Sequence, residues 1–248
     1  MILPPLLAEF IGTALLLLLG AGVVANVNLK QTIANNQNPW MLITTAWAFA
    51  VFVGVFVSAQ SSGAHLNPAV TLGLAVAGKF SWSLLPGYLL AQLLGAMCGS
   101  FLAYLAYIDH YRATKDELAV KSTFCTGPAI RNFKNNLFAE GIGTFVLVFA
   151  ALMIASPNIN IEGSQVTQFG LGALDALPIA LVVWVIGLSL GGNTGYAINP
   201  ARDLGPRLVY QLLPRKNKQA DWSYSWVPIL GPFVGGAAAG GVYLLLAL

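Results

Sequence analysis

Two stretches of the chain decide its fold: SGAHLNPAVTLG at residues 62–73 and TGYAINPARDLG at residues 194–205. Each contains the tripeptide Asn-Pro-Ala, and the two copies, 132 positions apart, are Asn67, Pro68, Ala69, Asn199, Pro200 and Ala201. Asparagine is a favoured N-cap and proline a favoured first helical residue, so each copy predicts the start of a helix. The first apolar run, to Gly78, would be roughly 16 Å long, about half the apolar thickness of a bilayer. We therefore expect two half-length helices, over 68–78 and 200–213.

The composition indicates a membrane protein. Of 248 residues, 57% are hydrophobic and only 8% are charged, and the mean hydropathy is +0.73. A helix needs about 20 apolar residues to cross a bilayer, and six runs are expected to span it: Ile2–Ala25, Trp40–Ala59, Leu84–Ile108, Leu137–Ala155, Phe169–Leu190 and Trp226–Leu248. The first run has no basic leader, so we interpret it as a retained span. The predicted class is an all-α membrane protein with six transmembrane helices and two half-spanning re-entrant helices.

The chain also contains an internal repeat. AEFIGT at residues 8–13 returns as AEGIGT at residues 139–144, at nearly the same offset as the two Asn-Pro-Ala copies. Each half holds three full spans, and an odd number of crossings inverts the second half relative to the first. We expect one domain over 1–248, built from repeats 1–108 and 137–248 joined by loop 109–136. Irregular backbone before each half-helix cannot face lipid, so it must line a wet cavity or be buried in protein.

Several function classes find little support. The net charge of +3 comes without a basic run, so no nucleic-acid partner is expected. Cys98 and Cys125 support neither a disulfide framework nor a metal site, and His65 and His110 are the only histidines. No glycine-rich phosphate loop follows a strand. We expect no enzyme, no cofactor and no metal.

The chain resembles the major intrinsic protein family, the aquaporins and glycerol facilitators, over nearly its whole length. The resemblance rests on both Asn-Pro-Ala copies, on Ala8-Glu9-Phe10 with its repeat at Glu140, on SGAH at 62–65, and on Gly205-Pro206. It implies six spans and two half-helices around one pore per subunit, with four subunits in a homotetramer. It also implies a multi-pass protein of the plasma membrane, with the lipid bilayer and small neutral solutes as its partners.

The predicted pore has its centre where the half-helix N-termini face each other. Each N-terminus is equivalent to about +0.5 charge, which disfavours cations and hydronium at that point. Asn67 and Asn199 are expected to offer N–H donors to the lumen while their oxygens cap the backbone. Carbonyl groups of the preceding loops are expected to supply acceptors; they belong to Gly63, Ala64, His65, Leu66, Asn193, Thr194, Gly195 and Tyr196.

Arg202 stands where the other repeat has Val70, and a buried arginine in a membrane suggests function. Without the family, Arg202 could instead snorkel to the surface or pair with Asp203. By resemblance it matches the arginine of the family's selectivity filter, whose other positions fall on Trp47, Gly187 and Tyr196. Water-selective members have histidine where Gly187 stands, and the glycine is expected to leave a wide opening.

Two further residues, Asp203 and Arg207, resemble glycerol facilitators, in which an aspartate follows the filter arginine. Tyr196 departs from the phenylalanine common in that group. This combination predicts a filter for an amphipathic solute such as glycerol, with a substrate profile that the tyrosine hydroxyl modifies.

Glu9 and Glu140 are the other charges expected inside the membrane. They could form a proton relay, which would indicate a proton-coupled, alternating-access carrier. They could instead accept hydrogen bonds from unpaired backbone N–H groups of the loops, and their matching places in the two repeats favour this structural role. A passive channel for glycerol, water and related small uncharged solutes is thus the leading prediction, with the carrier and a scaffold with a vestigial pore as alternatives.

The charges of the loops disagree with the family's orientation. The family places both termini in the cytoplasm and loops 26–39, 109–136 and 191–225 outside, which leaves Lys79 as the only inward basic residue. The positive-inside rule favours the opposite orientation. We keep the family orientation as the expectation.

Overall fold

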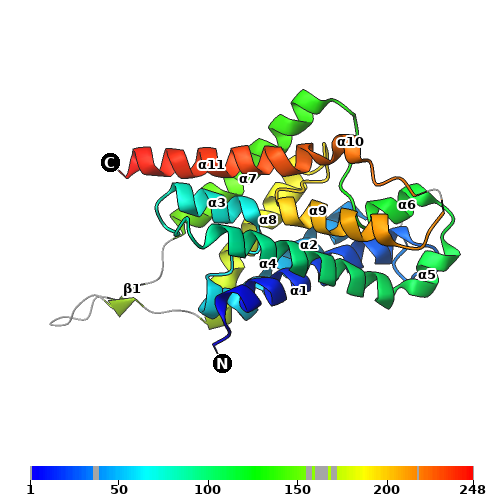
Figure 1. Cartoon of the computed structure of the whole chain (residues 1–248), viewed down its shortest axis with the longest axis horizontal. Helices are drawn as coiled ribbons and strands as arrows, with labels where there is room; N and C mark the ends of the chain where they lie inside the picture. The colour runs from blue at the N-terminus through cyan, green and yellow to red at the C-terminus, as the bar shows by residue number, and fades with distance from the viewer. Residues whose placement is uncertain are drawn as a thin grey trace.

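The computed structural model describes residues 2–35, 39–154, 158–159, 167–168, 172–216 and 218–247. Within them, six helical stretches are long and apolar enough to cross a membrane. They are α1 (Pro5–Asn28), α2 (Trp40–Ser62), α4 (Leu85–Ala106), α7 (Phe133–Met153), the 3-10 helix η1 (Gly172–Ala176) with α8 (Leu177–Leu190), and α10 (Trp222–Ser225) with α11 (Val227–Leu246). They run roughly parallel to the long axis in Figure 1. The predicted fold class is confirmed.

Some predicted span limits differ from the structure. The fourth helix begins at Phe133 rather than Leu137, because Asn132 caps it by accepting a hydrogen bond from Asn135 N. The predicted ends at Ala155 and Leu248, and the start at Phe169, lie outside the described residues.

Both half-length helices are present, as α3 (Pro68–Val76) and α9 (Pro200–Leu212). Helix α3 is shorter than predicted because the chain turns at Gly78, whose φ of 69° is left-handed. Gly78 N donates to Ala75 O at 3.1 Å and Lys79 N to Leu74 O at 2.8 Å, which is the paired bonding of a Schellman motif. Since α3 has only nine residues, it reaches about half way through the apolar layer.

The helices of the two halves pack in a reciprocal way. Helix α1 packs chiefly on α4, and α7 packs chiefly on α11. Each half-helix then contacts the last span of the other half, α3 against α11 and α9 against α4. Two glycines allow the closest approaches: an added Cβ would stand 2.1 Å from Ala14 O at Gly99 and 2.0 Å from Gly141 O at Gly235. The contacts of α3 with α11 and of α9 with α4 interlock the halves and bring the two Asn-Pro-Ala copies together, whereas the close approaches at Gly99 and Gly235 each lie within one half.

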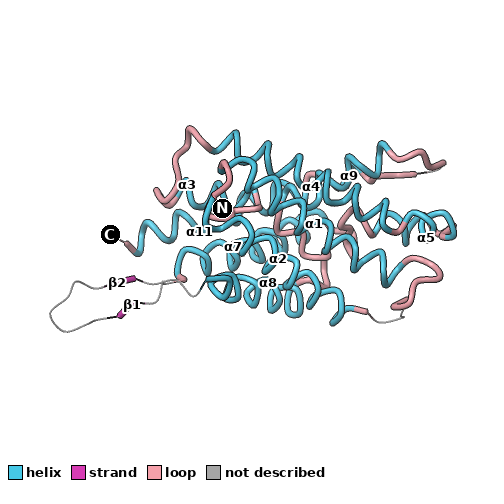
Figure 2. The backbone as a smooth tube through the Cα atoms, turned by 90° about the horizontal axis from the view of Figure 1, so that it is seen from below, coloured by secondary structure: helices cyan, strands magenta, loops and turns pink. Residues whose placement is uncertain are grey.

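The connecting segment 109–136, predicted as a loop, contains two short helices, α5 (Ile108–Ala113) and α6 (Glu117–Ser122). Rings of Tyr111, Phe124 and Tyr210 pack together and close this segment onto the end of α9. Figure 1 and Figure 2 place α5 at one end of the bundle and the C-terminus at the other.

Two very short strands, which the sequence did not predict, pair antiparallel: β1 (Asn158–Ile159) and β2 (Thr167–Gln168). Figure 2 shows them beyond the helices, at the end of the bundle that holds the C-terminus. They take no part in the site described below.

Candidate functional site

The site is built around the N-termini of α3 and α9. Asn67 and Asn199 adopt extended backbone conformations and cap these helices through their side-chain oxygens. Asn67 Oδ1 accepts from Ala69 N at 2.9 Å, and Asn199 Oδ1 accepts from Ala201 N at 3.0 Å. The prolines that follow occupy the first helical turn, where a missing N–H costs nothing.

The two asparagines also join the halves directly. Asn67 Nδ2 donates to Ile198 O at 2.7 Å, and Asn199 Nδ2 donates to Leu66 O at 2.9 Å. An amide NH₂ group carries two hydrogens, so each side chain keeps a second N–H after this bond. Both asparagines line the same cavity, where that second donor is available to a small polar molecule.

The loops before the half-helices have matching irregular backbones. Ala64 (φ 51°) and Leu66 (φ 52°) are left-handed, and so are Tyr196 (φ 37°) and Ile198 (φ 43°) in the other half. Left-handed conformations cost roughly 1–2 kcal/mol at each residue other than glycine. The structure therefore needs contacts that hold both loops in place.

Glu9 supplies those contacts for the first loop. Its Oε1 accepts from His65 N at 2.9 Å and from Ser62 Oγ at 2.6 Å. Its Oε2 accepts from Leu66 N at 2.8 Å. The carboxylate is fully buried and lies on α1.

Glu140 occupies the corresponding place in the second half, on α7. Its Oε1 accepts from Ala197 N at 3.0 Å and its Oε2 from Ile198 N at 2.8 Å. The side chain of Thr194 also bonds to this carboxylate. Each membrane-embedded glutamate thus faces the backbone donors of a left-handed loop.

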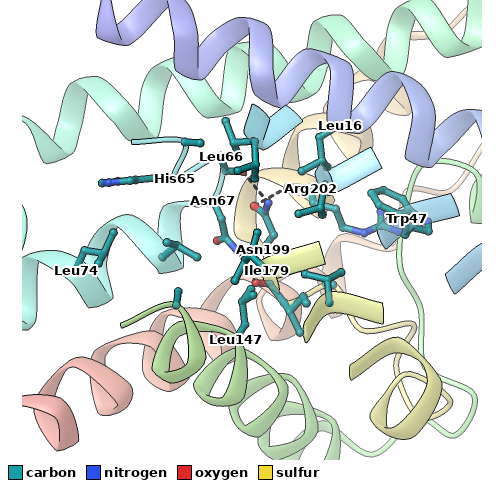
Figure 3. A pocket seen from close by; sticks show the side chains of 18 of the residues that line it. Leu16, Trp47, His65, Leu66, Asn67, Leu74, Leu147, Ile179, Asn199 and Arg202 are labelled. Carbon is teal, nitrogen blue, oxygen red and sulfur yellow. Dashed lines mark hydrogen bonds between the residues drawn. The ribbon is translucent and has the colours of Figure 1, made fainter. Parts of the chain in front are cut away.

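A cavity of about 320 Å³ runs past the junction of the half-helices. Figure 3 shows Trp47 and Arg202 toward one end, His65 and Leu74 toward the other, and the two asparagines between them. Of the predicted site residues, those lining it are Trp47, Gly63, Ala64, His65, Leu66, Asn67, Tyr196, Asn199 and Arg202.

Much of the cavity wall is apolar, and the sequence did not predict the residues that form this part of it. This part is formed by Leu16, Val51, Val55, Leu147, Ala151, Ile154, Ile179 and Val183. These residues come from α1, α2, α7 and α8 and from the residue after α7. No local signal separates them from lipid-facing residues, because every span is apolar almost all round. The cavity is therefore lined by both polar groups and aliphatic side chains.

Other predicted residues lie outside this lining. Asn193 O, expected as an acceptor in the lumen, instead accepts from Ala129 N at 3.0 Å, so it anchors segment 109–136. Gly195 N donates to Gly191 O at 2.9 Å, and Thr194 is buried beside Glu140. Pro68, Ala69, Pro200 and Ala201 are buried within the half-helices that they begin.

Arg202 lies against the ring of Trp47. Its Cζ is 4.2 Å from the ring centroid, close enough for a cation–π contact. Its backbone N donates to Asn199 Oδ1 at 3.2 Å, so the capping asparagine also fixes the start of the arginine's own turn. The guanidinium has five N–H donors in a rigid plane, and it brings them to the cavity at this end.

Tyr196 occupies the space beside Gly187. A Cβ added at Gly187 would stand 2.8 Å from Cζ of Tyr196 and 3.0 Å from its Cε2. The opening expected beside this glycine is therefore filled by the tyrosine ring. Within the described part of the chain, the buried Tyr196 hydroxyl has no hydrogen-bond partner. An edge contact with Trp40, at 5.8 Å between ring centroids, supports the ring from outside.

Asp203 pairs with Arg207 rather than with Arg202. Arg207 Nε lies 2.8 Å from Asp203 Oδ2, and both side chains are fully buried. Asp203 Oδ1 also accepts from Thr126 N at 2.9 Å, and Arg207 Nη2 donates to Thr126 O at 3.1 Å. The pair therefore ties α9 to segment 109–136, and Arg202 is left facing the cavity.

Gln92 is a site residue that the sequence analysis did not identify. Its Nε2 donates to Glu9 Oε2 at 2.7 Å and to Thr71 Oγ1 at 2.9 Å, while Thr71 Oγ1 donates to Asn67 O at 3.1 Å. A chain of hydrogen bonds thus links the glutamate to the first capping asparagine. A lone glutamine in an apolar span was the available signal, because buried polar groups in membranes need partners.

Comparison with known proteins gives a consistent result. The family model described as Major intrinsic protein matches residues 2–243. The chain is 50% identical over 238 residues to the probable glycerol uptake facilitator protein of Thermotoga maritima, covering 96% of this chain and 97% of that protein. It is 38% identical over 239 residues to the D/L-lactic acid transporter of Lactiplantibacillus plantarum, covering 94% of each. The solved structure of the aquaglyceroporin from Plasmodium falciparum aligns with a TM-score of 0.81 at 34% identity, covering 96% of this chain and 94% of that one.

Proposed function

The chain belongs to the major intrinsic protein family, and from this premise we propose that it is a passive transmembrane channel for glycerol, water and related small uncharged solutes. The single observation that carries the proposal is the cavity beside the junction of α3 and α9, which is lined by both polar groups and aliphatic side chains. Glycerol needs both kinds of contact, because it carries hydroxyl groups on a carbon chain. Relatives named as glycerol uptake facilitators, at 43–51% identity, support this choice of solute.

Exclusion of cations follows from the electrostatics of the junction. Two helix N-termini meet there, each equivalent to about +0.5 charge. The side-chain oxygens of Asn67 and Asn199 already accept from N–H groups of the first helical turns, so a passing molecule meets the side-chain N–H groups of the two asparagines instead. A neutral hydroxyl can accept from these groups, whereas a cation is repelled by the positive potential of the two helix N-termini. The guanidinium of Arg202 adds a full positive charge at one end of the same path.

The selectivity filter is proposed to consist of Arg202, Trp47, Tyr196 and Gly187. Arg202 would donate to solute hydroxyls, and the Trp47 ring would contact the carbon chain. The Tyr196 ring covers Gly187, so the tyrosine sets the width that the glycine was expected to set. Asp203 and Arg207 would act indirectly, by holding α9 and segment 109–136 together.

Glu9 and Glu140 are proposed to be structural. Both are buried, and both accept at least two backbone N–H bonds from the left-handed loops. A proton relay needs carboxylates that are free to exchange protons along the path. Because both oxygens of each carboxylate accept hydrogen bonds from loop N–H groups, the arrangement favours a channel over a proton-coupled carrier.

Further parts of the proposal concern assembly and orientation. We propose a homotetramer in the plasma membrane, with repeats 1–108 and 137–248 in each subunit. Large apolar side chains exposed on α2 and α8, such as Phe49, Phe56, Leu181 and Val185, are available for subunit contacts or lipid. Both termini would be cytoplasmic, with α5 and α6 at the outer end of the bundle (Figure 1).

The test is a flux measurement on purified protein in lipid vesicles. Stopped-flow light scattering should show glycerol entry well above that of protein-free vesicles and linear in the glycerol gradient. A panel of water, urea and lactic acid at low pH then ranks the solutes. Glycerol entry equal to bare lipid contradicts the proposal, and saturable uptake driven by a pH gradient would favour a carrier.

A further inference from the structure

The indole of Trp47 lies directly against the backbone of α1 at a glycine. A Cβ added at Gly20 would stand 2.3 Å from Cζ3, 2.4 Å from Cη2 and 2.5 Å from Cε3 of that indole. Such similar distances to neighbouring ring atoms place the added carbon over the ring face, because an edge approach would leave the flanking atoms much farther away. Trp47 therefore occupies the volume that a side chain at position 20 would need.

The contact at Gly20 differs from the close contacts that glycines of α4 make with α1. At Gly95 and Gly99 on α4, the nearest atom to an added Cβ is a backbone oxygen of α1, as expected where two helices cross. At Gly20 all three nearest atoms belong to one side chain, that of Trp47. The glycine at position 20 thus accommodates a ring rather than a helix crossing.

The ring has little room to move except toward the cavity. Trp47 is 6% exposed, so packed protein surrounds it on most sides. It borders the cavity and contacts the guanidinium of Arg202, 4.2 Å from the ring centroid to Cζ. A methyl group at position 20 would push the indole off α1, toward the cavity and Arg202.

We propose that Gly20 is a positioning residue for the selectivity filter: by lacking a side chain, it lets Trp47 lie back against α1 and so sets the opening beside Arg202. This inference rests on the proposed function of the same pore. It extends the filter to a residue of α1 that does not line the cavity. The width of this opening should matter most for the permeation of polyols, because their cross-section exceeds that of water.

A matched pair of alanine substitutions tests the inference. Gly20→Ala should narrow the filter, whereas Gly22→Ala, two positions along the same helix, adds a Cβ with nothing within 4 Å. In vesicles, Gly20→Ala is expected to lower the ratio of glycerol to water permeability by roughly tenfold, the lower range for one methylene in a fitted pocket. Gly22→Ala should leave this ratio at the wild-type value.

A second variant separates positioning from general damage to packing. Trp47→Phe shortens the ring that meets the new methyl group, so combining it with Gly20→Ala should raise the ratio above that of Gly20→Ala alone. A ratio that stays unchanged or rises in Gly20→Ala overturns the inference, as does an equal loss of both permeabilities without rescue. Wild-type vesicles that pass no glycerol would instead overturn the proposed function, so the two failures are distinguishable.

Discussion

At the scale of single residues, the site depends on matched pairs of buried polar groups. The side-chain oxygen of each capping asparagine accepts a hydrogen bond from a backbone N–H of the helix that it begins. Its side-chain nitrogen donates to a carbonyl of the loop in the other half. Each glutamate satisfies two loop N–H groups that have no partner in a regular element. Unsatisfied backbone groups are expensive in a membrane, so such pairs keep an irregular loop stable beside a cavity.

The role of Glu140 gives a prediction about stability. In Glu140→Gln, the amide nitrogen cannot accept, so either Ala197 N or Ile198 N loses its partner. A buried donor left unpaired costs about 1–3 kcal/mol, and the thermal transition of the purified protein should fall accordingly. The control is Asp109→Asn, whose parent carboxylate is 84% exposed and should change little. Equal transitions in the two variants would contradict the structural role.

At the scale of elements, α9 does two tasks with residues of its first two turns. Its Arg202 faces the cavity, while its Asp203 and Arg207 hold segment 109–136 against the helix. Residues i and i+4 lie on one helical face, which explains why Arg207 rather than the adjacent Arg202 pairs with Asp203. The division keeps the cavity arginine free of a carboxylate partner on its own helix.

The buried pair gives a prediction for α9. Asp203→Asn leaves the Arg207 charge buried beside a neutral amide, and breaking a buried pair costs about 3–5 kcal/mol. The variant should lose thermal stability and show faster hydrogen exchange around Thr126. Arg112→Gln serves as control, because it breaks an ion pair whose side chains are 70% and 84% exposed. If both variants behave like wild type, the pair does not hold the segment.

How far the sequence predicts each element depends on how local its signal is. The half-helix starts were predictable because Asn67 and Asn199 cap within two or three residues. Helix α6 carries a similar signal at Asp116, which accepts from Leu118 N and Ala119 N, although the sequence analysis predicts a loop over this segment. The contact of Gly20 with Trp47 is a tertiary contact between helices, so the order of residues along the chain does not display it.

At the scale of the whole molecule, segment 109–136 closes one end of the bundle. Cys125 lies in this segment, is only 4% exposed, and packs with residues of α1, α5, α6 and α9. A cysteine in an open loop would be reactive, because an ordinary thiol has a pKa near 8.5. The reactivity of this thiol therefore reports whether the segment is packed as the structure has it.

Burial raises the pKa of Cys125 to about 12. In a Cys98→Ser background, maleimide labelling of Cys125 should be much slower than labelling of a free thiol at both pH 7 and pH 9, because the thiolate remains a small fraction below its raised pKa. Denaturation of the protein in detergent should expose the Cys125 thiol and make its labelling fast. A labelling rate equal to that of a free thiol at these two pH values would show that the segment opens.

The reciprocal bonds of the two asparagines bear on biosynthesis. When the ribosome has synthesised only residues 1–108, the amide of Asn67 and the carbonyl of Leu66 lack their partners, Ile198 and Asn199, which are not yet made. The nascent first half therefore lacks these two hydrogen bonds, and it must stay in contact with the translocon or lipid until the second half is synthesised. Separately expressed halves should resist proteolysis only when produced together in the same cell.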